Sequence, residues 1–277
     1  MKDPQTKLDL ETKQILTDLT AITDSLQVPM LLIGARARLL IFDSQYNVQG
    51  RATTDWDVAV QLDSWERYYA LVTKMITGQV PRFKKTSVIH KFIHIETGLE
   101  VDVIPFGSIS NDLQEITWPD GNQMSILGLQ EAFFNTQIEK IDNIELRIAN
   151  IYAFIVLKLL AWNERREKKD LEDIIFVLQN YQEEERVYEE LVDELLTDKF
   201  EVDEASIVVL GRDIRKAFRK ETLNKVSKIV TQIIENQNRF IPQFVPKNLD
   251  ENAWDEAFEK IVRRFQVLQY GLEEAYT

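Results

Sequence analysis

The sequence predicts an α+β protein, with a small mixed β-sheet in an N-terminal head (residues 1–126) and an all-helical C-terminal domain (residues 127–277). Two observations lead to this prediction. In the head, apolar residues recur both at helical spacing and in short runs that end at glycine or turn residues. After about Leu127 they recur at helical spacing alone. The 277 residues suffice for one large domain or two ordinary ones.

The head is expected to alternate helices and strands. A first helix must end before Pro29, and Thr97-Gly98 is typical of the turn of a β-hairpin. In chain order we expect a helix over 7–27, strands over 29–34 and 53–62, a helix over 64–77, and an antiparallel hairpin of strands 88–96 and 99–107.

The second part is expected to be helical throughout. Pro242 and Pro246 predict a loop before the last helix. The expected helices include residues 128–138, 151–181 and 252–269.

Composition excludes several kinds of site. The chain has no cysteine, which excludes thiolate metal ligands and cysteine nucleophiles, and its two histidines, His90 and His94, are too few for a histidine-rich metal centre. We expect both to be ordinary strand residues. The net charge of −13 disfavours broad, non-specific binding of nucleic acid, although a local basic cleft stays open. No apolar run is long enough to span a membrane and no secretory leader is recognisable, so we expect a cytoplasmic protein.

Two carboxylates stand at the start of the strand in "RATTDWDVAV". Asp55 and Asp57 are two residues apart, so their side chains point to the same face of the strand. Asp102, in "LEVDVIPF", adds a third carboxylate from the hairpin. Carboxylates gathered this way favour a hard divalent cation such as Mg²⁺, which acts on phosphoryl groups. The alternative for Asp102 is an edge-strand position that faces water.

A glycine and a helical lysine indicate phosphate contacts. Gly34 ends a strand and opens a helix, whose N-terminal N–H groups attract phosphate. Lys158 interrupts the apolar run "IYAFIVLKLLAW" and needs a partner or a ligand, and Arg165 and Lys169 fall near the same helix face. The alternatives for Lys158 are a snorkelling side chain or an ion pair with Asp170 or Asp173.

Several blocks together resemble a known family. The blocks "GARAR", "RATTDWDVAV", "SWERY", "EVDVIPFG", "WPDGNQMSILGLQEA" and "LKLLAWNERREKKDLEDI" resemble the AbiEii/AbiGii toxin-type nucleotidyltransferases of the polymerase-β-like nucleotidyltransferase superfamily. The resemblance covers residues 28 to 182. It departs from the commoner Gly-Ser pair, because Ala35 follows Gly34 here.

The resemblance implies a polymerase-β-like head in which Asp55, Asp57 and Asp102 are catalytic and bind Mg²⁺ or Mn²⁺. Lys158 and Asp170 match the lysine and aspartate of the family's helical motif, and the lysine is expected at the triphosphate. The candidate nucleotide-binding residues are Gly34, Ala35, Arg36, Arg51, Thr53, Lys158, Arg165 and Asp170.

The implied reaction transfers a nucleoside monophosphate from an NTP to an acceptor hydroxyl and releases pyrophosphate. The expected acceptor is a tRNA or a protein, and the implied role is that of a toxin in a toxin–antitoxin or phage-defence system, with an antitoxin protein as partner. The segment "GRDIRKAFRK" (211–220) is a candidate for contact with a polyanion, or a solvated helix surface. Two alternatives remain: an inactive binding protein with this fold, and a transferase for an aminoglycoside-like small molecule.

Overall fold

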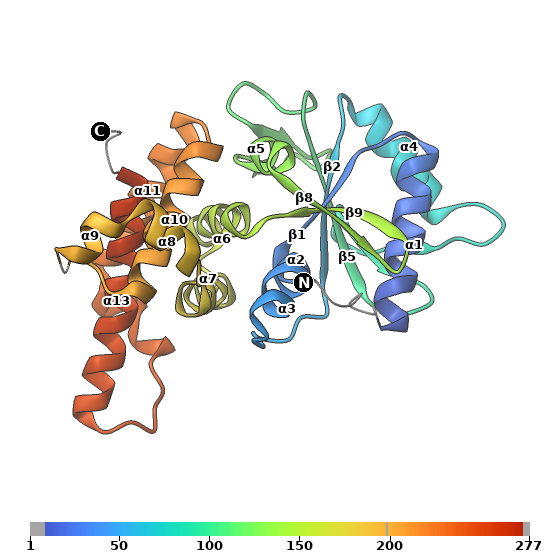
Figure 1. Ribbon diagram of the computed structural model, residues 1–277. Coiled ribbons are helices and arrows are strands. Elements are labelled where there is room, and N and C mark those ends of the chain that lie inside the picture. The colour runs from blue at the N-terminus through green and yellow to red at the C-terminus, as the bar shows by residue number, and fades with distance from the viewer. Residues whose placement is uncertain (1–8, 198, 274–277) are drawn as a thin grey trace. The chain divides into compact units, whose positions relative to one another are not determined.

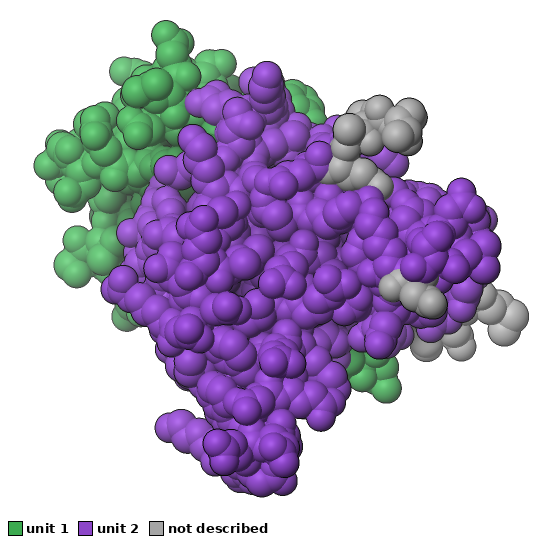
Figure 2. Space-filling view, turned by 90° about the vertical axis from the view of Figure 1, so that its left-hand side faces the viewer, with its two compact units in different colours: residues 1–154 green, residues 155–277 purple. Residues whose placement is uncertain are grey.

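The chain forms two compact units, residues 1–154 and 155–277, shown green and purple in Figure 2. The computed structural model describes residues 9–197 and 199–273. The first unit contains a mixed sheet with helices, and the second is helical in its described residues, so the fold is α+β as the sequence predicted (Figure 1).

The first unit follows the predicted alternation of helices and strands. The predicted helix over 7–27 is observed from Leu10, and residues 7 and 8 lie outside the described part. Asp9 caps this helix, because its Oδ1 accepts a hydrogen bond of 2.8 Å from the Thr12 N–H. The elements are α1 (Leu10–Ser25), β1 (Met30–Ile33), α2 (Gly34–Arg38), a π-helical segment (Leu39–Asp43), α3 (Ser44–Tyr46), β2 (Trp56–Gln61), α4 (Trp65–Ile76), β3 (Phe83–Lys85), β4 (Lys91–His94), β5 (Glu100–Phe106), β6 (Glu115–Thr117), β7 (Gln123–Ser125), α5 (Leu129–Phe134), β8 (Thr136–Ile141) and β9 (Ile144–Ala149).

The main sheet has seven strands in the order β3-β4-β5-β2-β1-β9-β8. β1 and β2 are antiparallel, β2 and β5 are parallel, and β4 and β5 form the predicted antiparallel hairpin. β9 lies parallel to β1 and antiparallel to β8. Because β2 and β5 are parallel neighbours, the N-terminal ends of both strands lie at the same end of the sheet. β6 and β7 form a separate two-stranded sheet.

Helices α1 and α4 pack on one face of the main sheet. Leu19 of α1 and Leu71 of α4 line a small cavity together with Val58, Val60 and Val103 of the sheet. Adjacent residues of a strand point to opposite faces, so Asp57 and Asp102 project from the face that α1 and α4 leave uncovered.

The hairpin β8–β9 differs from the prediction, which placed residues 127–154 in the helical domain. Only Leu129–Phe134 of the expected helix over 128–138 is helical, and Thr136 already belongs to β8. Asp142 and Asn143 form the turn with positive φ angles of 48° and 67°. Asp and Asn tolerate this left-handed conformation, which matches the twist of a tight hairpin. β9 then pairs with β1, so these residues complete the sheet of the first unit.

The second unit consists of helices. α6 begins in the last residues of the first unit and continues into the second. Gly211 and Gly271 let α10 and α13 approach closely, because a Cβ atom on Gly271 would lie 2.5 Å from the carbonyl oxygen of Val208. The elements are α6 (Ile151–Arg165), α7 (Lys168–Asn180), α8 (Glu184–Glu190), α9 (Val192–Leu196), α10 (Val202–Ala217), α11 (Lys220–Glu235), α12 (Gln237–Phe240), a 3₁₀ segment (Pro242–Phe244) and α13 (Glu251–Glu273).

The predicted helix over 151–181 is interrupted once. Arg166 has a φ angle of 55°, and α7 starts at Lys168 after this break. A left-handed residue ends an α-helix, so the chain can turn and pack α7 separately. The predicted closing helix over 252–269 is confirmed as α13. Across the described residues, no helix combines the length and the apolar character that a membrane span requires.

Candidate active site

Asp57 and Asp102 are neighbours on adjacent parallel strands. Asp57 of β2 is in register with Asp102 of β5, and both side chains are partly exposed on the uncovered face of the sheet. Asp55 precedes β2 by one residue and shares the parity of Asp57. The parallel register therefore brings together two of the predicted catalytic carboxylates, which lie 45 positions apart in the sequence.

Gly34 lies directly against the carboxylate of Asp57. Its φ angle is +70°, and a Cβ atom at this position would lie 2.1 Å from Asp57 Oδ2. Both the backbone conformation and the available space therefore require glycine here. Ala35, the next residue, is buried in α2. The glycine that the sequence assigned to phosphate binding thus also has a structural role beside an acidic residue.

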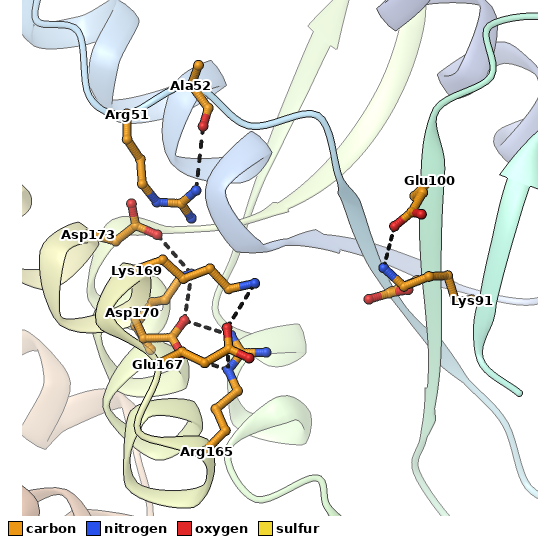
Figure 3. A network of polar contacts seen from close by, with 11 residues as sticks. Arg51, Ala52, Lys91, Glu100, Arg165, Glu167, Lys169, Asp170 and Asp173 are labelled. Carbon is orange, nitrogen blue, oxygen red and sulfur yellow. Dashed lines mark hydrogen bonds and ion pairs between the residues drawn. The ribbon is translucent and has the colours of Figure 1, made fainter. Parts of the chain in front are cut away.

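A lysine stands among the carboxylates. Lys91 of β4 is in register with Asp102, its Nζ lies 3.6 Å from Asp102 Oδ1, and it donates a hydrogen bond of 2.6 Å to Glu100 Oε2 (Figure 3). Burial opposes its charge, but the hydrogen bond to Glu100 and the charges of Asp102, Glu100 and Asp55 together hold the pKa of Lys91 above its usual value. The site thus contains an internal cation.

Burial raises the pKa of Asp102 above the usual value for an aspartate. The attraction of Lys91 lowers it, while the charges of Asp55 and Glu100 add to the increase. The side chain of Asp102 is 21% exposed, and its buried Oδ1 accepts no hydrogen bond from the described residues. A carboxylate whose pKa is raised this way is suited to accept a proton at neutral pH.

A buried arginine holds the loop that leads into β2. Arg38 is fully buried, lies 3.6 Å from Asp43 Oδ2, and donates a hydrogen bond of 3.1 Å to the carbonyl of Arg51. The Gly50 N–H donates to Asp43 Oδ2 at 3.1 Å. These contacts fix the backbone before Asp55. Arg51 and Thr53, two of the predicted nucleotide-binding residues, lie on this loop with partly exposed side chains.

Arg36, another predicted nucleotide-binding residue, lies on the helix-covered side of the sheet. Its guanidinium carbon is 4.9 Å from the ring centroid of Trp56, which is fully buried. Burial lowers the pKa of Arg36, and the charges of Asp9, Glu11 and Asp55 raise it, with burial the stronger influence. The charge of Asp55 acts on Arg36, but the guanidinium of Arg36 packs against the buried ring of Trp56.

The two histidines contact side chains other than the three predicted catalytic carboxylates. His94 is fully buried and its Nε2 is 3.0 Å from Asp18 Oδ2 of α1. The His90 ring is 5.3 Å from the ring of Trp118, which in turn contacts Trp65 of α4. Burial, and next the charge of Lys91, lower the pKa of His90, while the charges of Asp120 and Asp57 raise it.

The predicted residues of the helical motif lie in the second unit, where the buried Lys158 and Asp170 form a cluster with Asp173 and the exposed Arg165. Lys158 lies 3.0 Å from Asp170 Oδ1 and 2.9 Å from Asp173 Oδ2, so the ion pair considered from the sequence is present. Arg165 donates two hydrogen bonds of 2.7 Å to the Asp170 carboxylate (Figure 3). Burial opposes the ionised form of Asp170, but these donors hold its pKa below the usual value. The assignment of Lys158 to a triphosphate stays a prediction.

The oxygen donors of the first unit suit a hard divalent cation in their chemistry. Asp55, Asp57 and Asp102 offer carboxylate oxygens, which Mg²⁺ and Mn²⁺ prefer, and Asp102 Oδ1 has no hydrogen bond to give up. Over residues 9–197 and 199–273, no three His, Asp or Glu side chains are close enough to form a complete metal site. The donor set therefore fits such an ion, and its assembled geometry stays a prediction.

Sequence reasoning missed Lys91 and the pair Arg38–Asp43. Lys91 could have been found by counting along the predicted hairpin, since the register opposes it to Asp102. Arg38 carried no such signal, because an arginine in "GARAR" looks like an exposed helix residue until its partner Asp43 is placed.

No model of a known protein family matches the chain, and no curated protein matches it. Solved structures that are similar to it include a nucleotidyltransferase-like protein from Paracoccidioides brasiliensis, with 18% identity, a TM-score of 0.41, and coverage of 76% of this chain and 94% of that one. The antibiotic-resistance factor ANT(2'')-Ia is 17% identical with a TM-score of 0.37, over 59% of this chain and 81% of that one. The Thermotoga maritima CCA-adding enzyme complexed with tRNA is 15% identical with a TM-score of 0.27, over 96% and 83%. At these scores and identities, the similarities assign no function to this chain.

Proposed function

We propose that the chain is a metal-dependent nucleotidyltransferase, which transfers a nucleoside monophosphate from an NTP to an acceptor hydroxyl and releases pyrophosphate. The observation that carries this proposal is the parallel register of β2 and β5, which pairs Asp57 with Asp102 beside the backbone of Gly34. Grouping carboxylates lowers the stability of the fold, because like charges repel. A function that uses these carboxylates would explain why the sequence places them together.

Asp55, Asp57 and Asp102 are the residues that would hold Mg²⁺ or Mn²⁺. Such an ion, when bound, stabilises the charge that develops on the attacking and leaving oxygens. Asp102 is also the proposed base for the acceptor hydroxyl, because burial and the charges of Asp55 and Glu100 raise its affinity for a proton. Lys91 neutralises part of the carboxylate charge before the substrate arrives.

The proposed phosphate contacts are the backbone of Gly34 and Ala35 and the side chains of Arg51 and Thr53. Arg36 belongs to the proposal through the sequence alone, because its guanidinium packs on Trp56. The loop that carries Arg51 and Thr53 is held by Arg38 and Asp43, so its backbone is organised before substrate binds. We also propose a nucleotide-binding role for three residues of the helical segment, solely because the sequence there resembles the family's helical motif. They are Lys158, Arg165 and Asp170. Their mutual ion pairs give each of them a structural role as well.

The acceptor that we propose is a macromolecule, either a tRNA or a protein hydroxyl. The blocks that resemble AbiEii/AbiGii toxins support this choice, and they also support a toxin role in which an antitoxin protein is the partner. We place the reaction in the cytoplasm, where NTP substrates are present.

The proposal is tested with purified protein, each α-labelled NTP, Mg²⁺, and an extract that contains RNA and protein. Label that moves with RNA and is removed by ribonuclease identifies an RNA acceptor, while label removed by protease identifies a protein. The Asp57→Asn variant should transfer about a thousandfold more slowly than the wild type, and Asp63→Asn should transfer normally, because Asp63 follows β2 and is exposed. Equal transfer by wild type and Asp57→Asn would contradict the proposal.

The alternatives predict different results in the same experiment. A catalytically inactive binding protein would bind NTP and Mg²⁺ without any labelled product. A transferase for an aminoglycoside-like molecule would label only a cationic small molecule added to the mixture, which the net charge of −13 would attract.

A further inference from the structure

A surface of the second unit combines three cations with three aromatic rings. It is formed by the end of α6, the start of α7, α12 and the 3₁₀ segment that follows. We call it the basic aromatic surface, and it consists of Arg166, Lys168, Arg239, Phe240 and Phe244, with the buried ring of Trp162 beneath Arg166.

Each cation of this surface lies over a ring. The guanidinium carbon of Arg166 is 4.0 Å from the ring centroid of Trp162, and the Arg239 guanidinium carbon is 5.4 Å from that of Phe240. Lys168 Nζ is 5.5 Å from the centroid of Phe244. Trp162 and Phe240 pack edge to face at 5.0 Å. Segments that are distant in the sequence therefore converge here.

No carboxylate neutralises these cations within the described residues. The polar partners of Arg166 are the neutral amides of Gln232, at 2.9 Å, and Asn163, at 3.3 Å. The neighbouring basic residues differ, since Arg165 pairs with Asp170 and Lys169 pairs with Glu167. Exposed cations without acidic partners are unexpected in a chain with a net charge of −13.

Arg166 and Arg239 are also close enough to repel each other. Burial, and next the charge of Arg239, hold the pKa of Arg166 below its usual value. Arg166, Lys168 and Arg239 are all exposed, so an anion can reach them. Holding like charges together costs free energy unless an anion binds between them.

We propose that the basic aromatic surface binds a single-stranded nucleic acid, with its phosphates on Arg166, Lys168 and Arg239 and its bases against Phe240 and Phe244. Cations that follow a backbone and rings that stack on bases are the two elements of single-strand binding sites. The half-buried rings of Phe240 and Phe244 suit unpaired bases, whereas an acidic peptide needs only the charges. The inference rests on the proposed function in one respect only, namely that the bound strand serves as the acceptor.

The test measures binding of a fluorescent oligouridylate of about 12 nucleotides to the full chain by anisotropy, with no NTP and no Mg²⁺. Failure of the transferase therefore leaves this measurement unaffected. Three phosphate contacts predict that the affinity falls about 20-fold when salt rises about fourfold. An oligothymidylate of the same length shows whether the strand is RNA or DNA, and binding of either supports the proposal.

Two matched double variants locate the binding. Arg166→Gln/Arg239→Gln should bind more weakly, with an affinity that falls only about threefold over the same change in salt, because one phosphate contact is left. Lys225→Gln/Lys228→Gln removes the same charge from exposed positions of α11 and should behave like the wild type. Phe244→Leu should weaken binding about tenfold and leave the salt dependence unchanged. Thermal unfolding of each variant confirms that it is folded.

Three results would overturn the proposal. The first is no binding by the wild type at low salt. The second is an equal loss of affinity in the two double variants, because binding would then follow overall charge and not this surface. The third is competition by polyglutamate that is as effective as competition by unlabelled oligonucleotide, which would assign the surface to an acidic peptide.

Discussion

The backbone of Gly34 lies against the carboxylate of Asp57, and a Cβ atom at residue 34 would lie 2.1 Å from Asp57 Oδ2. This contact joins the end of β1 to the start of β2, because Ile33 and Asp57 are in register. The glycine therefore determines where the carboxylate can lie, which makes the Gly34–Asp57 contact the most direct structural link between the fold and the proposed chemistry.

Gly34→Ala is expected to destabilise the protein and to abolish transfer. The φ angle of +70° alone costs about 1–3 kcal/mol for alanine, and the contact with Asp57 adds to this cost. Gly98→Ala is a matched control, because Gly98 has a φ angle of +73° and open space around its Cβ position. Urea unfolding should show a larger loss for Gly34→Ala, and transfer should persist in Gly98→Ala. Equal losses of stability would contradict the contact.

Asp102→Asn is expected to change how stability depends on pH. The folded protein raises the pKa of Asp102 above 3.8, so it favours the protonated form. The stability that this form contributes is present below pH 3.8 and is lost as pH rises through the folded pKa. The free energy of unfolding of the wild type should therefore fall relative to that of Asp102→Asn across this range. Parallel curves for the two proteins, measured by chemical unfolding, would count against the assignment.

Lys91→Met is expected to lose about 1 kcal/mol of stability, since its ion pairs are partly exposed. Removing the ammonium also leaves the carboxylates of Glu100 and Asp102 without this cation. Mg²⁺ should therefore raise the melting temperature of Lys91→Met more than that of the wild type. Lys84→Met, at an exposed position of β3, is the control and should respond to Mg²⁺ as the wild type does. An equal rise in melting temperature with Mg²⁺ in the wild type, Lys91→Met and Lys84→Met would contradict the proposed competition between Lys91 and the metal ion.

Lys158→Met is expected to destabilise the second unit by about 3 kcal/mol, because it removes an ammonium that is paired with two fully buried carboxylates, of which Asp170 keeps Arg165. Adding Asp173→Asn should restore part of this loss. The folded pKa of Asp170 is below 3.8, so the stability from this cluster is present above pH 3.8 and is lost as pH falls through the folded value. A loss below about 1 kcal/mol for Lys158→Met in thermal unfolding would show that the pair is unimportant.

Much of the first unit was predictable because its signals are local. Three local patterns predicted one element each through spacing or turn chemistry. The apolar run before Gly34 predicted β1, the "DWD" segment predicted β2, and the turn at Thr97-Gly98 predicted the β4–β5 hairpin. The β8–β9 hairpin was missed because Leu129–Phe134 is helical and the expected helix was extended to residue 138, past Thr136, where β8 begins.

The candidate site was predictable in its acidic part and not in its basic part. Asp57 and Asp102 stand out because carboxylates are unusual within apolar strands, whatever their pairing. The pairing of Arg38 with Asp43 and the stacking of Arg166 on Trp162 depend on a π-helical segment and on a left-handed residue. Helical periodicity in the sequence predicts neither the π-helical segment nor the left-handed residue.

The most direct test of the account is the initial rate of nucleotide transfer by wild type, Asp57→Asn and Asp63→Asn, measured with α-labelled NTP, Mg²⁺ and the extract described above. Asp57→Asn should lose about a thousandfold in rate, because the substitution removes a group that stabilises transition-state charge, and Asp63→Asn should react at a rate near that of the wild type. Transfer by Asp57→Asn at the rate of the wild type, with both variants folded, would contradict the central claim.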